Sequence, residues 1–237
     1  MTEVLDIRQK GGPRNGERQV LDKQLFMQFL AWGGAKDRAA LAKALAASKL
    51  EAVLYEDLND PEGVGLLTWN ENPGHFLDIA KTLLKTDAFR SLIFKPEYVM
   101  LGRTYALGHE ADLEDWLIRR PARSVVDPAW PWAVWYPLRR KGEFAALAPE
   151  EQTAILREHG KIGHSFGEAD LAKDVRLASF GLDKNDNDFV IGLIGRELHP
   201  LSVCVETMRK TRQTSRYIQR MGPFFIGKAL WRSPSAA

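Results

Sequence analysis

The stretch WYPLRRKGEFAALAPEEQTAILREHGKIG, residues 135–163, places a strand, a basic loop and a helix in direct succession. The strand is predicted over residues 133–136, an apolar run that ends in Tyr-Pro. The helix is predicted over residues 149–159, because a proline followed by two glutamates favours a helix start. Gly160 is typical of the residue that follows a helix end. The rest of the chain is interpreted around this unit.

Five side chains of this unit carry useful chemistry. Tyr136 supplies a phenol, Arg139, Arg140 and Lys141 supply cations, and His159 supplies an imidazole. A neutral imidazole nitrogen can bind a metal, and the cations can hold carboxylates. The set suits an anionic tetrapyrrole with iron at its centre. From the residues alone, however, the favoured interpretation of His159 is a histidine that interacts with the dipole at a helix end.

The composition is that of an ordinary globular protein. The chain has 237 residues, of which 45% are apolar and 27% charged, enough for one large or two small domains. Its net charge of +2 argues neither for nor against nucleic acid, and no nucleic-acid partner is predicted. The single cysteine, Cys204, excludes an internal disulfide and fits a reducing, cytoplasmic location. The polar start and the absence of a long apolar run predict neither a signal peptide nor a membrane partner.

The first half of the chain is predicted to follow the order β-α-β-β-α-β. Apolar runs mark its strands, and Asp37 and Pro73 mark its helix starts. The turn Asn59-Asp60-Pro61-Glu62-Gly63 separates its second and third strands. The predicted elements are residues 25–32, 38–48, 52–57, 64–69, a helix from 73, and 98–107.

The second half repeats that order. Its elements are predicted at residues 133–136, 149–159, 174–180, 188–194, 200–217 and 224–230. The segment GLLTWNENPGHFLDIAKTLLKT of the first half even parallels VIGLIGRELHPLSVCVETMRKT of the second. The predicted fold class is therefore α+β, two ferredoxin-like units whose sheets pack together or curl into a barrel. We expect a flexible N-terminus at 1–19, units at 20–110 and 132–231, a connector at 111–131 and a flexible tail at 232–237.

Five segments of the second half resemble the chlorite dismutase-like family, which includes the coproheme decarboxylases. They occur in the order of that family: YPLRRKGEF, LREHGKIG, FGLD, DFVIGL and MRKTRQTSRYIQRMGPFFIG. The resemblance implies a dimeric α/β-barrel fold, a heme or coproheme cofactor bound by the second half, and a closed ring of identical subunits such as a pentamer.

The resemblance also implies roles for individual residues. His159 falls on the proximal histidine that supplies an axial nitrogen to iron. Tyr136 falls on the tyrosine that the decarboxylases oxidise to a radical, although a tyrosine that anchors a strand end is the alternative. Either Arg140 or Lys141 falls on a cation that meets a propionate. Thr214 falls on a hydroxyl near a propionate, with a helix-surface threonine as the alternative.

The resemblance has two departures. The chlorite dismutases carry a distal arginine seven residues before the glycine of Gly-Leu-Asp, where this chain has Asp174. Arg176 lies two residues further on, hence on the same strand face, and is the candidate distal cation. A carboxylate that supports the proximal histidine has no firm counterpart, because Gln213 and Thr214 occupy that neighbourhood and Glu206 lies two turns earlier.

The leading hypothesis is a coproheme decarboxylase that uses hydrogen peroxide and acts in heme biosynthesis. The alternative enzyme is a chlorite dismutase that uses bound heme b, with Arg176 as the distal cation. A third hypothesis is a heme carrier or sensor without catalysis, in which His159 binds iron and Tyr136 is structural. His164 is expected to be a loop residue, and no second iron ligand is assigned.

Overall fold

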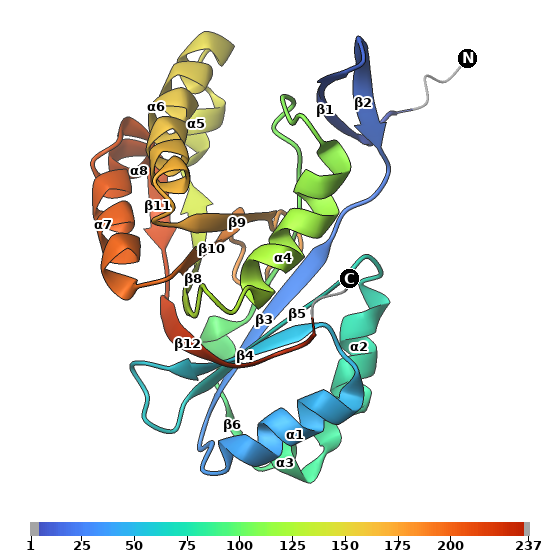
Figure 1. Ribbon diagram of the computed structural model, residues 1–237. Coiled ribbons are helices and arrows are strands. Elements are labelled where there is room, and N and C mark those ends of the chain that lie inside the picture. The colour runs from blue at the N-terminus through green and yellow to red at the C-terminus, as the bar shows by residue number, and fades with distance from the viewer. Residues whose placement is uncertain (1–4, 235–237) are drawn as a thin grey trace.

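The computed structural model describes residues 5–234, which form two four-stranded antiparallel units of the same topology (Figure 1). The strands of the first unit lie in the order β7-β3-β5-β4, and those of the second in the order β9-β10-β8-β12. Counted along the chain within each unit, the strand order is 4-1-3-2 in the first unit, and it is 4-1-3-2 in the second unit when that order is read from β12 to β9. The predicted α+β fold with a ferredoxin-like duplication is therefore confirmed. The strands are β3 (Phe26–Gly33), β4 (Ala52–Asp57), β5 (Val64–Asn70), β7 (Met100–Arg103), β8 (Trp132–Arg140), β9 (Lys173–Ala178), β10 (Phe189–Gly195) and β12 (Phe225–Arg232).

The two units join along both sheet edges and close a barrel. Strand β4 pairs with β12 on one side, and β7 meets β9 at Arg103 and Ala178 on the other. Alternate side chains of each strand point inward, so the barrel centre is filled by large aromatic residues. The fully buried aromatic residues of this core are Phe29, Tyr55, Trp69, Trp135 and Phe225. Of the two predicted arrangements, the curled barrel is the one that forms.

Helices cover the outer face of each sheet, in two groups at opposite ends of the molecule (Figure 1). Asp37 begins α1 as predicted, because its carboxylate accepts the Ala40 backbone N–H at 2.9 Å. The first unit has α1 (Arg38–Ser48), α2 (Gly74–Lys81), η1 (Leu83–Lys85), α3 (Asp87–Arg90) and η2 (Pro96–Tyr98), with the short strand β6 (Ile93–Phe94). The second has α5 (Gly142–Ala145), α6 (Pro149–Glu168), α7 (Leu198–Arg209) and α8 (Arg212–Tyr217), with the short strand β11 (Ile218–Met221).

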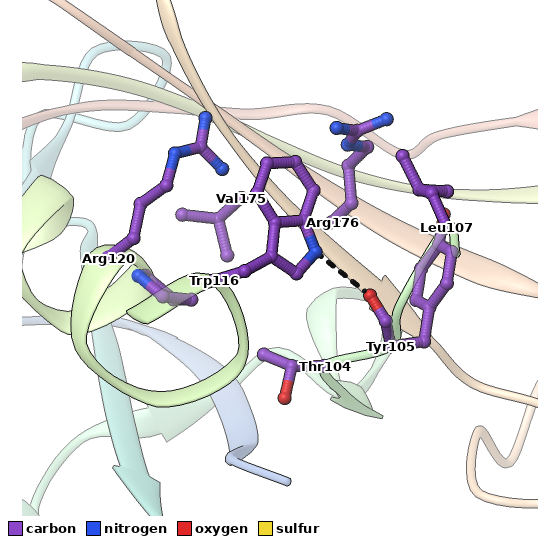
Figure 2. A pocket seen from close by; sticks show the side chains of 8 residues that line it. Thr104, Tyr105, Leu107, Trp116, Arg120, Val175 and Arg176 are labelled. Atoms are coloured by element: carbon purple, nitrogen blue, oxygen red, sulfur yellow. Dashed lines mark hydrogen bonds between the residues drawn. The ribbon is translucent and has the colours of Figure 1, made fainter. Parts of the chain in front are cut away.

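The predicted connector contains a helix that packs against the barrel. A π-helical turn, η3 (Asp115–Arg119), leads into α4 (Arg120–Val126). Val125 and Trp130 join the barrel core. The indole N–H of Trp116 donates to the Tyr105 carbonyl at 3.1 Å, so the connector is tied to the chain that leaves β7 (Figure 2).

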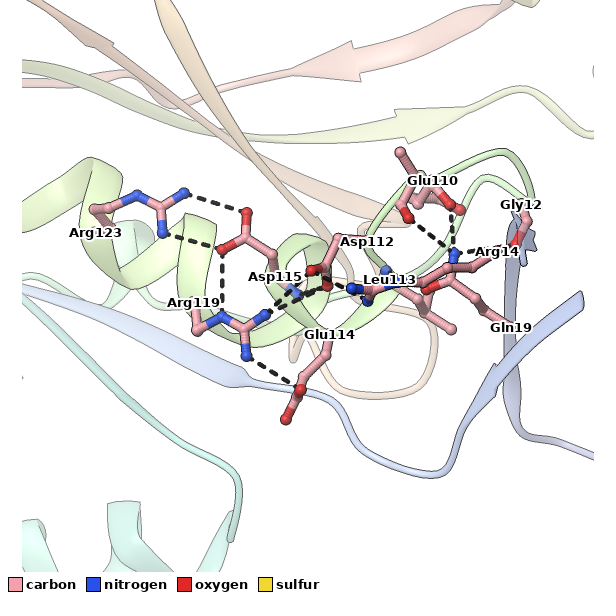
Figure 3. Close-up of polar contacts among 11 residues, drawn as sticks. Gly12, Arg14, Gln19, Glu110, Asp112, Leu113, Glu114, Asp115, Arg119 and Arg123 are labelled. Atoms are coloured by element: carbon pink, nitrogen blue, oxygen red, sulfur yellow. Dashed lines mark hydrogen bonds and ion pairs between the residues drawn. The ribbon is translucent and has the colours of Figure 1, made fainter. Parts of the chain in front are cut away.

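The two segments predicted to be flexible ends contain strands among their described residues. β1 (Gln9–Arg14) and β2 (Glu17–Leu21) form a hairpin. Gln19 fastens it, because its amide N–H groups donate to the carbonyls of Gly12 and Glu110 at 3.0 and 2.9 Å (Figure 3). At the other end, β12 includes Arg232, and the Ser233 backbone N–H donates to Ala52 at 2.9 Å. Residues 1–4 and 235–237 of these two predicted segments lie outside the described residues.

Two helix predictions and one strand prediction are corrected. α6 continues through Gly160 and the chain leaves it only near Asp170, which adopts the left-handed φ of 56°. A glycine in a helix costs only about 1 kcal/mol, so Gly160 does not stop it. The single helix predicted for 200–217 is two helices, because Thr211 begins α8 as its N-cap. Strand β8 runs on to Arg140, so Tyr136 lies inside a strand rather than at its end.

Candidate functional site

The outer face of the second sheet brings Tyr136 of β8 and Arg176 of β9 to the two sides of strand β10. Ile191 of β10 pairs with Tyr136 of β8 on one side and with Arg176 of β9 on the other. These three residues therefore form one row across the sheet, and their side chains point to the same face. Ile191 is only partly buried, so the helices do not cover this row completely.

Helix α6 lies over this sheet face and packs against it loosely. Of its twenty residues only Ile155 is buried. His159 and Phe166, which follow at helical spacing on the same side, are partly exposed. Gly163 lies one turn after His159, and a side-chain carbon placed there would meet only the end of the Met208 side chain, at 3.4 Å. On the face that α6 turns to the sheet, the residues after His159 are therefore small, as Gly163 is, or partly exposed, as Phe166 is.

His159 is held by one hydrogen bond and is kept neutral. Its Nδ1 lies 3.2 Å from the hydroxyl of Thr211, a buried residue between α7 and α8. Burial lowers the pKa of His159 from 6.5 to about 4, and the positive charges of Arg176 and Arg140 contribute in the same direction. At neutral pH the ring is uncharged, and Nε2 makes no hydrogen bond with the described residues.

Arg140 and Lys141 lie at the end of β8, and Arg140 is a strand residue rather than part of a loop. The guanidinium carbon of Arg140 lies 4.3 Å from the centre of the Phe144 ring and 5.0 Å from that of Phe189. Its buried Nε has no hydrogen-bond partner among the described residues, and burial lowers the pKa of the side chain. Lys141 is partly exposed and directly precedes α5. A buried guanidinium nitrogen without an acceptor is costly, which points to an anion that is not part of this chain.

Asp174 and Arg176 both face the same side of β9, as predicted, but they bind each other. Asp174 accepts from Arg176 at 2.7 Å and from Arg120 of α4 at 2.8 Å. Burial alone would raise the pKa of Asp174, but the charges of Arg176 and Arg120 hold it below its usual value. Trp116 lies between the two guanidinium groups (Figure 2). Its ring centre is 4.6 Å from the guanidinium carbon of Arg120 and 5.1 Å from that of Arg176.

The pocket in Figure 2 adjoins this cluster and is small. Its volume is about 10 Å³, and it is lined by Tyr105, Trp116, Arg120 and Arg176 among others. A cavity of that size holds about one water molecule. It is therefore not the space for a tetrapyrrole.

Tyr136 is buried within the sheet rather than exposed at a strand end. Its ring stacks on Phe224, with 4.5 Å between ring centres and 19° between ring planes. Burial raises the pKa of the phenol well above its usual value. The side chain therefore stays a neutral phenol at physiological pH, which is the form that can donate a hydrogen atom.

The other residues expected near the imidazole have different surroundings. Thr214 lies with its hydroxyl 3.3 Å from that of Thr211. Gln213 is buried, and its side-chain oxygen has no partner among the described residues. Glu206 is exposed and binds Lys210 at 2.8 Å, so it does not support His159.

Two further findings concern the histidine neighbourhood. His164 is on α6 rather than in a loop, and its exposed ring binds Glu168 at 3.1 Å. Thr211 was missed by the sequence interpretation. The spacing Thr-x-x-Thr at residues 211–214 is compatible with a helix N-cap, but nothing local places that threonine against a histidine 52 residues away.

The chain is similar to known proteins over most of its length. A family model described as chlorite dismutase matches residues 70–230. A solved structure of a novel heme-binding protein from Thermus thermophilus is 17% identical, covers 89% of this chain and 92% of its own, and gives a TM-score of 0.67. The chlorite dismutase from Candidatus Nitrospira defluvii in complex with imidazole is 16% identical, with coverages of 88% and 92% and a TM-score of 0.68. At these identities the two structures establish a shared fold.

Proposed function

The chain belongs to the chlorite dismutase family, and from this premise we propose that it is a heme-dependent oxidoreductase whose iron binds Nε2 of His159. The single observation that carries the proposal is the state of that imidazole. Its Nδ1 is occupied by Thr211, its ring is neutral, and its Nε2 is open. A neutral imidazole whose second nitrogen is hydrogen-bonded is the usual form of a metal-binding histidine.

The surrounding residues fit a tetrapyrrole. The described residues contain no group of three or more His, Cys, Asp or Glu side chains that could hold an ion, and a macrocycle would supply the other ligands of an iron at His159. Arg140, whose buried Nε lacks an acceptor, and Lys141 would hold its carboxylates. The partly covered sheet face around Ile191 would contact its apolar ring.

Within the family we propose coproheme decarboxylation as the reaction. Hydrogen peroxide is the oxidant: each propionate carboxylate loses carbon dioxide, one proton and two electrons to become a vinyl group. Peroxide takes up those two electrons, that proton and one more proton from solvent to become two water molecules. Bound iron would supply the redox chemistry with peroxide. Tyr136 would donate and recover a hydrogen atom, and Arg140 or Lys141 would fix the reacting propionate.

The position of Arg176 favours a second candidate, chlorite decomposition with bound heme b. Arg176 lies in the same row as Tyr136, where it could hold a small anion over the iron. The carboxylate of Asp174 alone would repel chlorite, but two guanidinium groups share it, so the local charge is net positive.

The test is mass spectrometry of the tetrapyrrole. The protein loaded with coproheme is treated with peroxide in small steps, and the expected products have lost one and then two carboxyl groups. A parallel oxygen-electrode assay with chlorite tests the second candidate. Tight heme binding without either activity would leave the carrier or sensor hypothesis.

We also propose a cytoplasmic, closed homo-oligomer. The described residues contain no helix that is long and apolar enough to cross a membrane. The exposed apolar side chains of Leu5, Ile7 and Ile93, each at least 70% exposed, are compatible with contacts to further subunits.

A further inference from the structure

We infer that Thr211 is the positioning residue of His159: its hydroxyl accepts the Nδ1 proton and thereby leaves Nε2 as the only nitrogen that can bind iron. The inference rests on the proposed function for the role of Nε2. It assigns to a neutral hydroxyl the role of the supporting carboxylate for which the sequence has no firm counterpart.

Hydrogen-bond counting at Thr211 fixes the direction of the contact. The Thr211 hydroxyl lies 2.7 Å from the Met208 carbonyl and 3.2 Å from His159 Nδ1. A carbonyl cannot donate, so the single hydroxyl proton belongs to the short contact with Met208. The hydroxyl oxygen can then only accept from the imidazole. His159 Nδ1 therefore carries the ring proton, and the Nε2 lone pair is free.

The hydroxyl oxygen of Thr211 also accepts a backbone hydrogen bond. The backbone N–H of Thr214 donates to it at 3.4 Å, since Thr211 is the N-cap of α8. Thr211 is 2% exposed, so water does not compete for the contact. The Thr214 hydroxyl lies 3.3 Å from the same oxygen and can itself donate. The Thr211 proton stays on the shorter Met208 contact, and the hydroxyl cannot turn that proton toward the ring without losing the Met208 bond.

The backbone around Thr211 is held against α6 by separate contacts. The carboxylate of Glu158, next to His159, lies 3.4 Å from the backbone N–H of Arg212. The Arg212 guanidinium binds Glu151 at 2.8 Å. The start of α8 is thus fastened to α6 beside the Thr211–His159 contact, and the ring orientation is set by two helices.

A hydroxyl acceptor has a chemical consequence for the iron. A carboxylate at Nδ1 would draw the proton toward itself and make Nε2 a stronger electron donor. A hydroxyl that already donates elsewhere draws it weakly, so the imidazole remains a neutral, moderate donor. The chain should therefore hold its iron with a weaker iron–histidine bond and at a higher reduction potential than a variant with a carboxylate at position 211.

Three substitutions test this inference. Thr211→Ser keeps the hydroxyl, Thr211→Val keeps the shape without it, and Thr211→Asp supplies a carboxylate. In the heme-free protein, nitrogen NMR should show the Nδ1–H form of His159 in the wild type and in Thr211→Ser, and a shift toward the Nε2–H form in Thr211→Val. With heme, Thr211→Asp should raise the iron–histidine stretching frequency and lower the reduction potential.

Controls separate this outcome from a folding defect and from failure of the proposed function. Asp37→Ala also removes a helix N-cap, that of α1, and should leave every His159 signal unchanged. Identical tautomer populations in the wild type and Thr211→Val would overturn the inference even if heme binds through His159. An iron–histidine band that persists in His159→Ala would instead overturn the proposed function, while the tautomer in the heme-free protein would still decide the role of Thr211.

Discussion

Acid sensitivity of the heme-free protein offers a quantitative test of the His159 environment. Burial and the charges of Arg176 and Arg140 lower the pKa of His159 from 6.5 to about 4. Between those two values the unfolded chain binds a proton that the folded chain does not. Stability therefore rises with pH in this window, is fully present above about pH 6.5, and is lost as the pH falls toward 4.

The magnitude follows from the size of the shift. A change of about 2.5 in pKa corresponds to roughly 3 kcal/mol at full effect, of which about 2 kcal/mol is lost between pH 7 and pH 5. The imidazole is partly exposed, and solvent screening reduces this effect. We expect His159 to account for about 1–2 kcal/mol of the stability lost over that interval.

The assay is urea unfolding of the heme-free protein at pH 7 and pH 5. Carboxylates such as Asp174, whose pKa is lowered, also destabilise the fold in acid, so the measured quantity is the difference between wild type and His159→Gln. His164→Gln, which removes an exposed imidazole from the same helix, is the matched control. An equal loss of stability in the wild type and His159→Gln would refute the buried, cation-flanked environment of this ring.

Four further predictions concern the iron ligand, the reaction, the stability of the ion-pair cluster and the assembly. His159→Ala should abolish the iron–histidine band and weaken heme retention at least tenfold, measured by transfer of heme to an acceptor protein. Tyr136→Phe should bind coproheme as the wild type does but lose at least nine-tenths of peroxide-driven decarboxylation, and a wild-type rate would reduce Tyr136 to a structural residue. Asp174→Asn should lower the free energy of unfolding in urea by about 1–3 kcal/mol, because Arg120 and Arg176 are left facing each other. If this variant changes the rate of chlorite turnover, Arg176→Ala should abolish that turnover. Light scattering at micromolar concentration should show a closed oligomer, and a monomer alone would contradict the proposed ring.

Local sequence signals determined most of the fold. The helix Arg38–Ser48 and the strand Ala52–Asp57 have the predicted bounds, because a side-chain cap and an apolar run are properties of neighbouring residues. The order of elements and the repeat of that order also follow from the sequence. Family resemblance, rather than any local pattern, singled out His159 as an iron ligand.

Only the tertiary structure decided which of these residues meet. Gly160 suggested a helix end, but packing of α6 against α7 and α8 offsets the small local preference. The row of Tyr136, Ile191 and Arg176 depends on the register of three strands, and register is set by the whole sheet. Thr211 reaches His159, and Arg120 reaches Asp174, across more than fifty residues of chain. Helix caps and strand periodicity are encoded within a few residues, whereas hydrogen bonds and ion pairs between distant segments exist only once the barrel has brought those segments together.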